Sequence, residues 1–137
     1  MAMKVTGGCM CGAVRYESTG DPGPAGHCYC RDCQYSSGGS NSSGMFVPKT
    51  GFKLSKGDVK YYEVTADSGK KLSRGFCTNC GSPLVSLLES MPDLIEIRVG
   101  SLDDPNVFKP GFNIYMASAP KWAPVAPDLP KFQKMPG

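Results

Sequence analysis

The residues of this sequence best suited to chemistry are its cysteines, which fall into three closely spaced groups. The seven cysteines form a C-x-C pair, a C-x-C-x-x-C group and a C-x-x-C pair: Cys9 and Cys11, then Cys28, Cys30 and Cys33, then Cys77 and Cys80. An odd number cannot pair completely as disulfides within one chain. Groups spaced this closely converge on a metal ion more readily than they form disulfides. The pattern therefore predicts metal sites.

Counting thiolates predicts two zinc ions of different kinds. A structural zinc takes four ligands in a tetrahedron, and the first and last pairs together supply four thiolates. The middle group supplies three, and a zinc with three protein ligands keeps an open position for water or substrate, which is typical of a catalytic site. We therefore expect a closed structural site and an open catalytic site, formed respectively by Cys9, Cys11, Cys77 and Cys80 and by Cys28, Cys30 and Cys33.

Other interpretations of the middle group stay open from the residues alone. His27 is the only histidine and could close the site as a fourth ligand, although its place directly before Cys28 makes a difficult geometry for the same ion. The three thiols could instead work without a metal in redox chemistry. A partition that joins them to one member of another pair ranks lowest, because it strands three cysteines.

The segments that must position these groups are predicted to be short strands. The sequence has 17 glycines and 12 prolines, which argue against long helices. Segments rich in β-branched and aromatic residues, several of them alternating, are separated by turn residues and so indicate an all-β domain. The expected strands are 13–18, 45–48, 59–65, 84–88, 94–99 and 112–116, and a turn or short helical turn is expected at 102–107.

Two segments look irregular. The Ser/Gly-rich segment 36–44 is predicted to be a mobile loop, and its backbone N–H groups at Gly38 and Gly39 are candidates to bind a ligand carboxylate. The proline-rich tail, 120–137, cannot form a regular helix or an inner strand. We expect it to lie extended on the body, held by Trp122, Leu129 and Phe132. The whole chain, 1–137, is then one zinc-binding domain with its tail packed on it.

The net charge and the hydropathy of the chain limit the kinds of partner that it can bind. A net charge of +3 is too small to indicate nucleic acid or a membrane surface. No apolar run is long enough to span a bilayer, and the first residues lack a signal peptide. We therefore expect a cytoplasmic protein with reduced cysteines, no nucleic-acid partner and no membrane partner. Three basic side chains are candidates to bind substrate carboxylates, although each could equally be a surface charge: Arg31, Lys70 and Arg74.

Taken together, the three motifs resemble the glutathione-dependent formaldehyde-activating enzyme (GFA) family. The segments that carry the resemblance are 8–16, 28–33 with 36–38, and 74–84, and the tail around Trp122 also fits, so that the resemblance covers nearly the whole chain. The resemblance implies a β-tent of short antiparallel strands around the same two zinc sites. It also implies a carbon–sulfur lyase that joins formaldehyde to glutathione, giving S-hydroxymethylglutathione, and catalyses the reverse. A small thiol such as glutathione would be the partner.

The chain departs from the family pattern at two positions. Tyr29 stands where the family commonly has histidine inside the middle group, and Asn113 stands where a histidine often precedes an apolar pair. Any proton-transfer or binding role of those histidines is therefore absent or changed. Two further functions are kept as alternatives: a non-catalytic zinc-binding module, and a thiol sensor that exchanges zinc for oxidation at the middle group.

Overall fold

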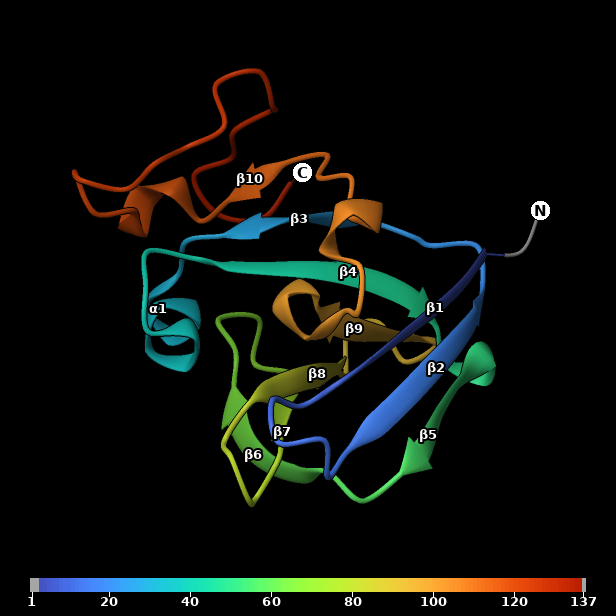
Figure 1. Ribbon diagram of the computed structural model, residues 1–137. Helices are drawn as coiled ribbons and strands as arrows, with labels where there is room; N and C mark the ends of the chain where they lie inside the picture. Colours follow the sequence, from blue (N-terminus) through green and yellow to red (C-terminus); the bar gives the residue numbers. More distant parts are fainter. Residues whose placement is uncertain (1–2, 137) are drawn as a thin grey trace.

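Two β-sheets form the framework of the computed structural model, which describes residues 3–136 (Figure 1). The smaller sheet has the order β1-β2-β5, with bounds Met3–Gly8, Arg15–Gly20 and Phe52–Lys56. The larger sheet has the order β10-β3-β4-β9-β8-β7-β6, with bounds Asn113–Ile114, Ala25–Cys28, Ser42–Pro48, Leu94–Arg98, Pro83–Leu88, Lys71–Phe76 and Lys60–Thr65. Every pairing is antiparallel except β10 with β3. The predicted fold class, mainly β with short strands, is confirmed.

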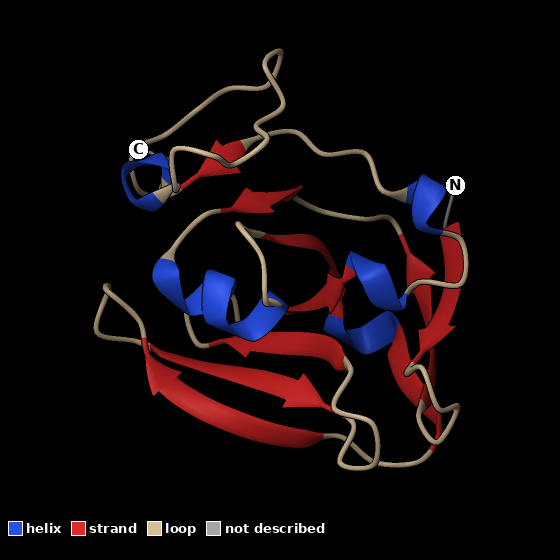
Figure 2. Ribbon diagram, turned by 60° about the vertical axis from the view of Figure 1, so that its left-hand side comes forward, coloured by secondary structure: helices blue, strands red, loops and turns tan. Residues whose placement is uncertain are grey.

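Helical segments are short. The helix α1 spans Arg31–Ser37, and four 3-10 turns, η1 to η4, span Lys49–Gly51, Val99–Ser101, Pro105–Val107 and Met116–Ser118. The η3 turn confirms the short helical turn expected at 102–107. In Figure 2 the helical segments lie beside the strands rather than forming a layer of their own.

One face of the larger sheet builds the core with the smaller sheet. Alternation along β4 and β9 buries Met45, Val47, Ile95 and Ile97 on the same side, because successive side chains of a strand point to opposite faces. These residues join side chains of the smaller sheet in a single apolar cluster that includes Val5, Val14 and Tyr16. The apolar positions of the two sheets thus face each other.

The opposite face of the larger sheet is polar. Strand register places Gly44 beside Arg98, Glu96 beside Ser86, and Ser86 beside Arg74. The same alternation that buries the isoleucines of β9 sends Glu96 and Arg98 to this side. Helix α1 lies against it, since Arg74 and Arg98 both hydrogen-bond to Ser36. A row of charged and hydroxyl groups therefore lies beneath α1.

The Ser/Gly-rich segment is mostly regular structure, so the prediction of a mobile loop over 36–44 was wrong for most of its length. Its start ends α1, where Gly38 adopts φ 77° and donates its N–H to the Gln34 carbonyl. Its end opens β4, in which Ser42 and Ser43 pair with β3. Residues 38–41 make the connection. Small residues suit this segment because Gly44 lies directly beneath the Glu96 carboxylate.

Backbone hydrogen bonds hold the proline-rich tail against β10 and η4. The Asn113 N–H donates to the Pro130 carbonyl at 2.8 Å, and the Phe132 N–H donates to the Asn113 carbonyl at 2.9 Å. Leu129 and Phe132 are partly buried. Trp122, however, is 71% exposed, so its predicted role as a core anchor was wrong. It lies two residues from a proline on either side, Pro120 and Pro124.

Gly7 is closely packed, so a side chain at this position should lower the free energy of unfolding. A Cβ at Gly7 would overlap the Tyr16 hydroxyl and the Ser101 carbonyl, whereas a Cβ at Gly100 would meet no atom within 4 Å. We expect Gly7→Ala to lower the free energy of unfolding by about 3 kcal/mol through overpacking. The matched change Gly100→Ala should stay within about 0.5 kcal/mol of wild type. Urea denaturation of both variants tests this, and equal midpoints would contradict the packing at Gly7.

Candidate metal centres

The first and last cysteine pairs meet although they are far apart in the chain. Cys9 and Cys11 lie in the turn between β1 and β2, and Cys77 and Cys80 lie in the turn between β7 and β8. The Cys9 and Cys11 sulfurs are 3.6 Å apart, and those of Cys11 and Cys77 are 3.8 Å apart. Zn–S bonds of about 2.3 Å in a tetrahedron place sulfurs about 3.8 Å apart. The arrangement fits a closed four-thiolate zinc site.

Hydrogen-bond donors surround these sulfurs. The Val14 N–H donates to the Cys9 sulfur at 3.2 Å, and the Asn79 side-chain amide donates to the Cys11 sulfur at 3.2 Å. The Ser82 hydroxyl and backbone N–H groups lower the pKa of the Cys80 thiol to about 5. Because zinc binds thiolates, donors that stabilise the anion also favour the metal.

The middle group converges through one strand end and one helix start. Cys28 ends β3, Cys30 is the N-cap of α1, and Cys33 follows in the first turn. The Cys33 N–H donates to the Cys30 sulfur at 3.3 Å. All three sulfurs lie within 4.8 Å of one another. Their number, spacing and softness fit a zinc ion with three protein ligands.

His27 does not complete this group. Its Nδ1 lies 2.7 Å from the Ser43 hydroxyl, and its ring meets the Phe108 ring edge-on at 5.5 Å. Because side chains alternate along a strand, His27 faces the side opposite to Cys28. Within residues 3–136, no other histidine, cysteine, aspartate or glutamate joins the three sulfurs. The alternative of closure by His27 is therefore wrong.

Two arginines supply positive charge beside the middle group. The Arg74 Nη2 lies 3.8 Å from the Cys33 sulfur, and its Nη1 donates to the Ser36 hydroxyl at 3.2 Å. Arg98 donates to the same hydroxyl at 3.3 Å. Hydrogen bonds from Cys28 and Cys30, together with Ser42 and the charge of Arg74, hold the pKa of Cys33 well below its usual range. Three thiolates and a dication carry one net negative charge, which the arginines offset.

A half-buried carboxylate, that of Glu96, shares this face. Burial raises the pKa of Glu96 to about 7, against the opposing effects of Arg98 and Arg74. The sequence analysis missed Glu96, Arg98, Ser36 and Ser42. The alternation of Ile95, Glu96, Ile97 and Arg98 marked two faces of a strand, but an alternating strand usually turns its charged face to water. Here Arg98 is buried and its guanidinium lies against Ser36 of α1.

Comparison with known families accords with this geometry. A profile described as glutathione-dependent formaldehyde-activating enzyme (GFA) matches residues 4–118. The chain belongs to the GFA family. A crystal structure of a Rhodobacter sphaeroides protein superposes with a TM-score of 0.60 at 17% identity, covering 93% of this chain and 98% of that one, which shows a shared fold. A comparison with curated proteins finds no match. None of the described helices has the length and apolar character needed to cross a membrane.

The two departures from the GFA pattern both contact the tail. The Tyr29 ring is buried and its hydroxyl donates to the Pro124 carbonyl at 3.0 Å. The Asn113 side chain is fully buried and its amide donates to the Ala126 carbonyl at 3.1 Å. Both acceptors lie beyond residue 118, where the GFA match ends. In this chain, positions that commonly hold histidine in the family anchor a segment outside the family match.

The predicted substrate-binding residues are placed very differently. Only Arg74 reaches a cysteine. The Arg31 guanidinium hydrogen-bonds to Gln34 and lies 5.0 Å from the centre of the Tyr35 ring. Lys70 is exposed in the turn between β6 and β7. Both glycine N–H groups are already engaged, that of Gly38 with the Gln34 carbonyl and that of Gly39 with the Ser37 hydroxyl.

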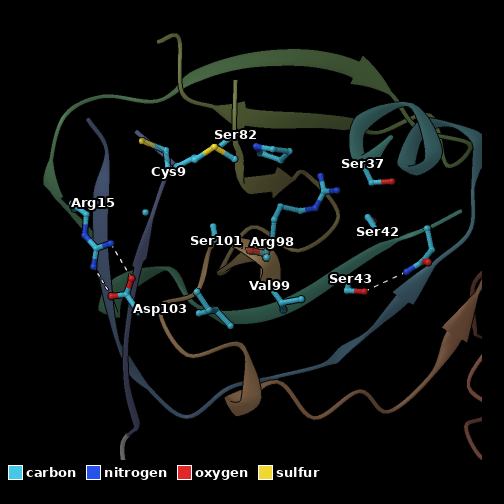
Figure 3. Close-up of a pocket in the computed structure, with 16 residues that line it drawn as sticks. Cys9, Arg15, Ser37, Ser42, Ser43, Ser82, Arg98, Val99, Ser101 and Asp103 are labelled. Carbon is cyan, nitrogen blue, oxygen red and sulfur yellow. Dashed lines mark hydrogen bonds and ion pairs between the residues drawn. The ribbon is translucent and has the colours of Figure 1, made fainter. Parts of the chain in front are cut away.

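A cavity of about 760 Å³ extends from Cys9 of the four-cysteine site toward the end of α1 and the start of β4 (Figure 3). Cys9 and Ser82 line one end, and Ser37 and Ser42 line the other. Arg98 projects toward the second end in Figure 3. The cavity thus borders the elements that carry the middle cysteine group.

Proposed function

We propose that this chain is a zinc-dependent carbon–sulfur lyase-type enzyme that joins a glutathione-like thiol to a small aldehyde such as formaldehyde, and catalyses the reverse. The observation that carries the proposal is the convergence of Cys28, Cys30 and Cys33 without a fourth protein ligand in the described chain. Family membership supports the choice of thiol and aldehyde, since the family description names both glutathione and formaldehyde.

The cysteines would hold the metal and leave room for the thiol. Cys28, Cys30 and Cys33 would hold the zinc, which would supply a Lewis acid that lowers the pKa of a bound thiol. In the addition, a sulfur lone pair forms the C–S bond while the C=O π pair moves to oxygen. That oxygen takes up the proton that the thiol has lost, so atoms and charge balance without an oxidant. The reverse step breaks the C–S bond and returns the proton to sulfur.

The surrounding residues suit an anionic sulfur. A thiolate substrate brings a second net negative charge to a site that already carries one. Arg74, with its Nη2 3.8 Å from the Cys33 sulfur, and Arg98, on the same face, stabilise that charge. Because both guanidinium groups hydrogen-bond to Ser36 of α1, they stay directed at the helix that carries Cys33.

Native mass spectrometry with and without glutathione tests the proposal. We expect two zinc ions per chain and a glutathione adduct. Cys30→Ser should keep one zinc, at the four-cysteine site, and lose the adduct. Turnover is then measured by NMR exchange between formaldehyde and its glutathione adduct. One zinc and no adduct in the wild type would contradict the enzyme and favour the non-catalytic module or the redox sensor.

A substitution at Tyr29 can distinguish a structural role of its hydroxyl from a role in catalysis. We expect Tyr29→Phe to keep two zinc ions and unchanged turnover, because its hydroxyl is bound to the Pro124 carbonyl. The lost hydrogen bond should lower the free energy of unfolding by about 1 kcal/mol. Exchange NMR and urea denaturation measure the two effects. A large loss of turnover with normal zinc content would instead assign Tyr29 to proton transfer.

A further inference from the structure

Arg98 is a buried cation that the protein satisfies only in part. Its residue is 6% exposed, and its guanidinium makes one hydrogen bond within the described chain, from Nη1 to the Ser36 hydroxyl. The ion pairs found among residues 3–136 do not include it. A guanidinium has five N–H donors and is always charged. Burying it with donors to spare is costly unless an anion takes them.

The free side of Arg98 faces the cavity that extends from Cys9 toward the end of α1 and the start of β4. Figure 3 shows its guanidinium directed toward Ser37 and Ser42. Asn41 and Ser43 line the same end. The other charged side chains on the wall, Arg15 and Asp103, are paired with each other at the far end, where Arg15 Nη1 lies 2.9 Å from Asp103 Oδ1. Among the charged side chains that line the cavity, Arg98 is therefore the one whose positive charge can bind a ligand. Hydroxyl and amide groups surround it.

The polar end of the cavity borders the open cysteine site. Ser42 lines the cavity, pairs with Cys28 across the strands, and helps to lower the pKa of Cys33. Ser37 belongs to the same helix as Cys33. A ligand held by Arg98 therefore has a short path to the three sulfurs. Small-molecule ligands occupy cavities of roughly 300–1,000 Å³, and this one measures about 760 Å³.

We propose that this cavity is the carboxylate subsite of the substrate, with Arg98 binding one carboxylate of the thiol and Ser42 adding a hydrogen bond. The proposal rests on the proposed function, and it defines the substrate class as a thiol that carries a carboxylate. Glu96 lies two residues before Arg98 on the same face and offsets part of its charge. The subsite therefore selects a single carboxylate.

Calorimetry with two matched thiols tests the subsite. The probes are glutathione and its analogue with both carboxylates converted to amides, each titrated into the zinc-loaded protein. Wild type should bind glutathione at least about tenfold more tightly, as expected for a charge-assisted hydrogen bond. Arg98→Gln should remove that preference, with glutathione losing at least about tenfold more affinity than the diamide, because only glutathione also loses the carboxylate contact. Zinc content and thermal unfolding of the variant show whether it is folded.

A second variant avoids a buried substitution. Asn41→Asp places a negative charge on the cavity wall and should weaken glutathione but not the diamide, whereas Asn106→Asp, on the exposed η3 turn, should weaken neither. Equal binding of both thiols to wild type would overturn the subsite and leave the enzyme proposal standing. An equal loss of both thiols in Arg98→Gln would also overturn it, because Arg98 would then act structurally. If neither thiol binds wild type, the proposed function fails as well.

Discussion

Cys77→Ser should leave most of the chain unfolded, even with excess zinc. Cys77 is buried, and its sulfur lies 3.8 Å from that of Cys11, 66 residues away in the sequence. Structural zinc contributes about 10–16 kcal/mol to the folding of small zinc domains, which matches or exceeds the roughly 5–15 kcal/mol of a typical domain. A serine hydroxyl is a far poorer zinc ligand. Far-UV circular dichroism and thermal unfolding in zinc-containing buffer measure the loss.

Cys30→Ser is the matched control for this prediction. It makes the same chemical change in a site built from one short segment at the end of β3 and the start of α1. We expect this variant to stay folded, with a melting temperature close to that of wild type and one zinc per chain. Equal destabilisation by the two substitutions would contradict the division into a structural and an open site.

Arg74→Gln should weaken zinc at the open site by about 10- to 100-fold, as for other residues that support metal ligands. Arg74 lowers the pKa of Cys33 through its charge, so its removal raises the pKa of that thiol. Protons then compete better with zinc, and the pH of half-occupancy at the open site must rise. Chelator competition followed over pH measures the shift, with the four-cysteine site as an internal reference.

Lys70→Gln controls for the loss of charge alone. Lys70 lies four residues before Arg74 and is exposed in the turn between β6 and β7. The same change in net charge should leave zinc affinity unaltered, because solvent screens an exposed charge. Equal weakening in both variants would assign the effect to overall charge rather than to the contact between Arg74 and Cys33.

Several features of the metal sites were predictable because cysteine spacing encodes them locally. The C-x-C and C-x-x-C pairs fixed the count of ligands, and counting alone separated the group of four from the group of three. The strands 84–88 and 94–99 were also found, since their apolar residues carry the core. Four strands were missed, among them β1 and β7, whose sequences mix lysine, serine and glycine with few apolar residues.

The surroundings of the open site were harder to predict because they depend on tertiary contacts. Arg98 and Glu96 look like the solvent face of an amphipathic strand, yet Arg98 is buried and its guanidinium lies against Ser36 of α1. That helix was itself missed, since it has only seven residues and ends in two serines. Trp122 was predicted to be buried and is exposed. Its size and aromatic character suggested a core anchor, but backbone hydrogen bonds hold the tail instead.

The two cysteine sites differ in the length of chain that separates their ligands. The four-cysteine site joins turns of two distant hairpins, whereas the three-cysteine site lies within one strand end and the helix that follows it. Emptying the second site therefore opens no large loop. When zinc is scarce, we expect the three-cysteine site to empty first and the protein to stay folded with one zinc at the four-cysteine site. A single ion would then restore it, with no need for new synthesis.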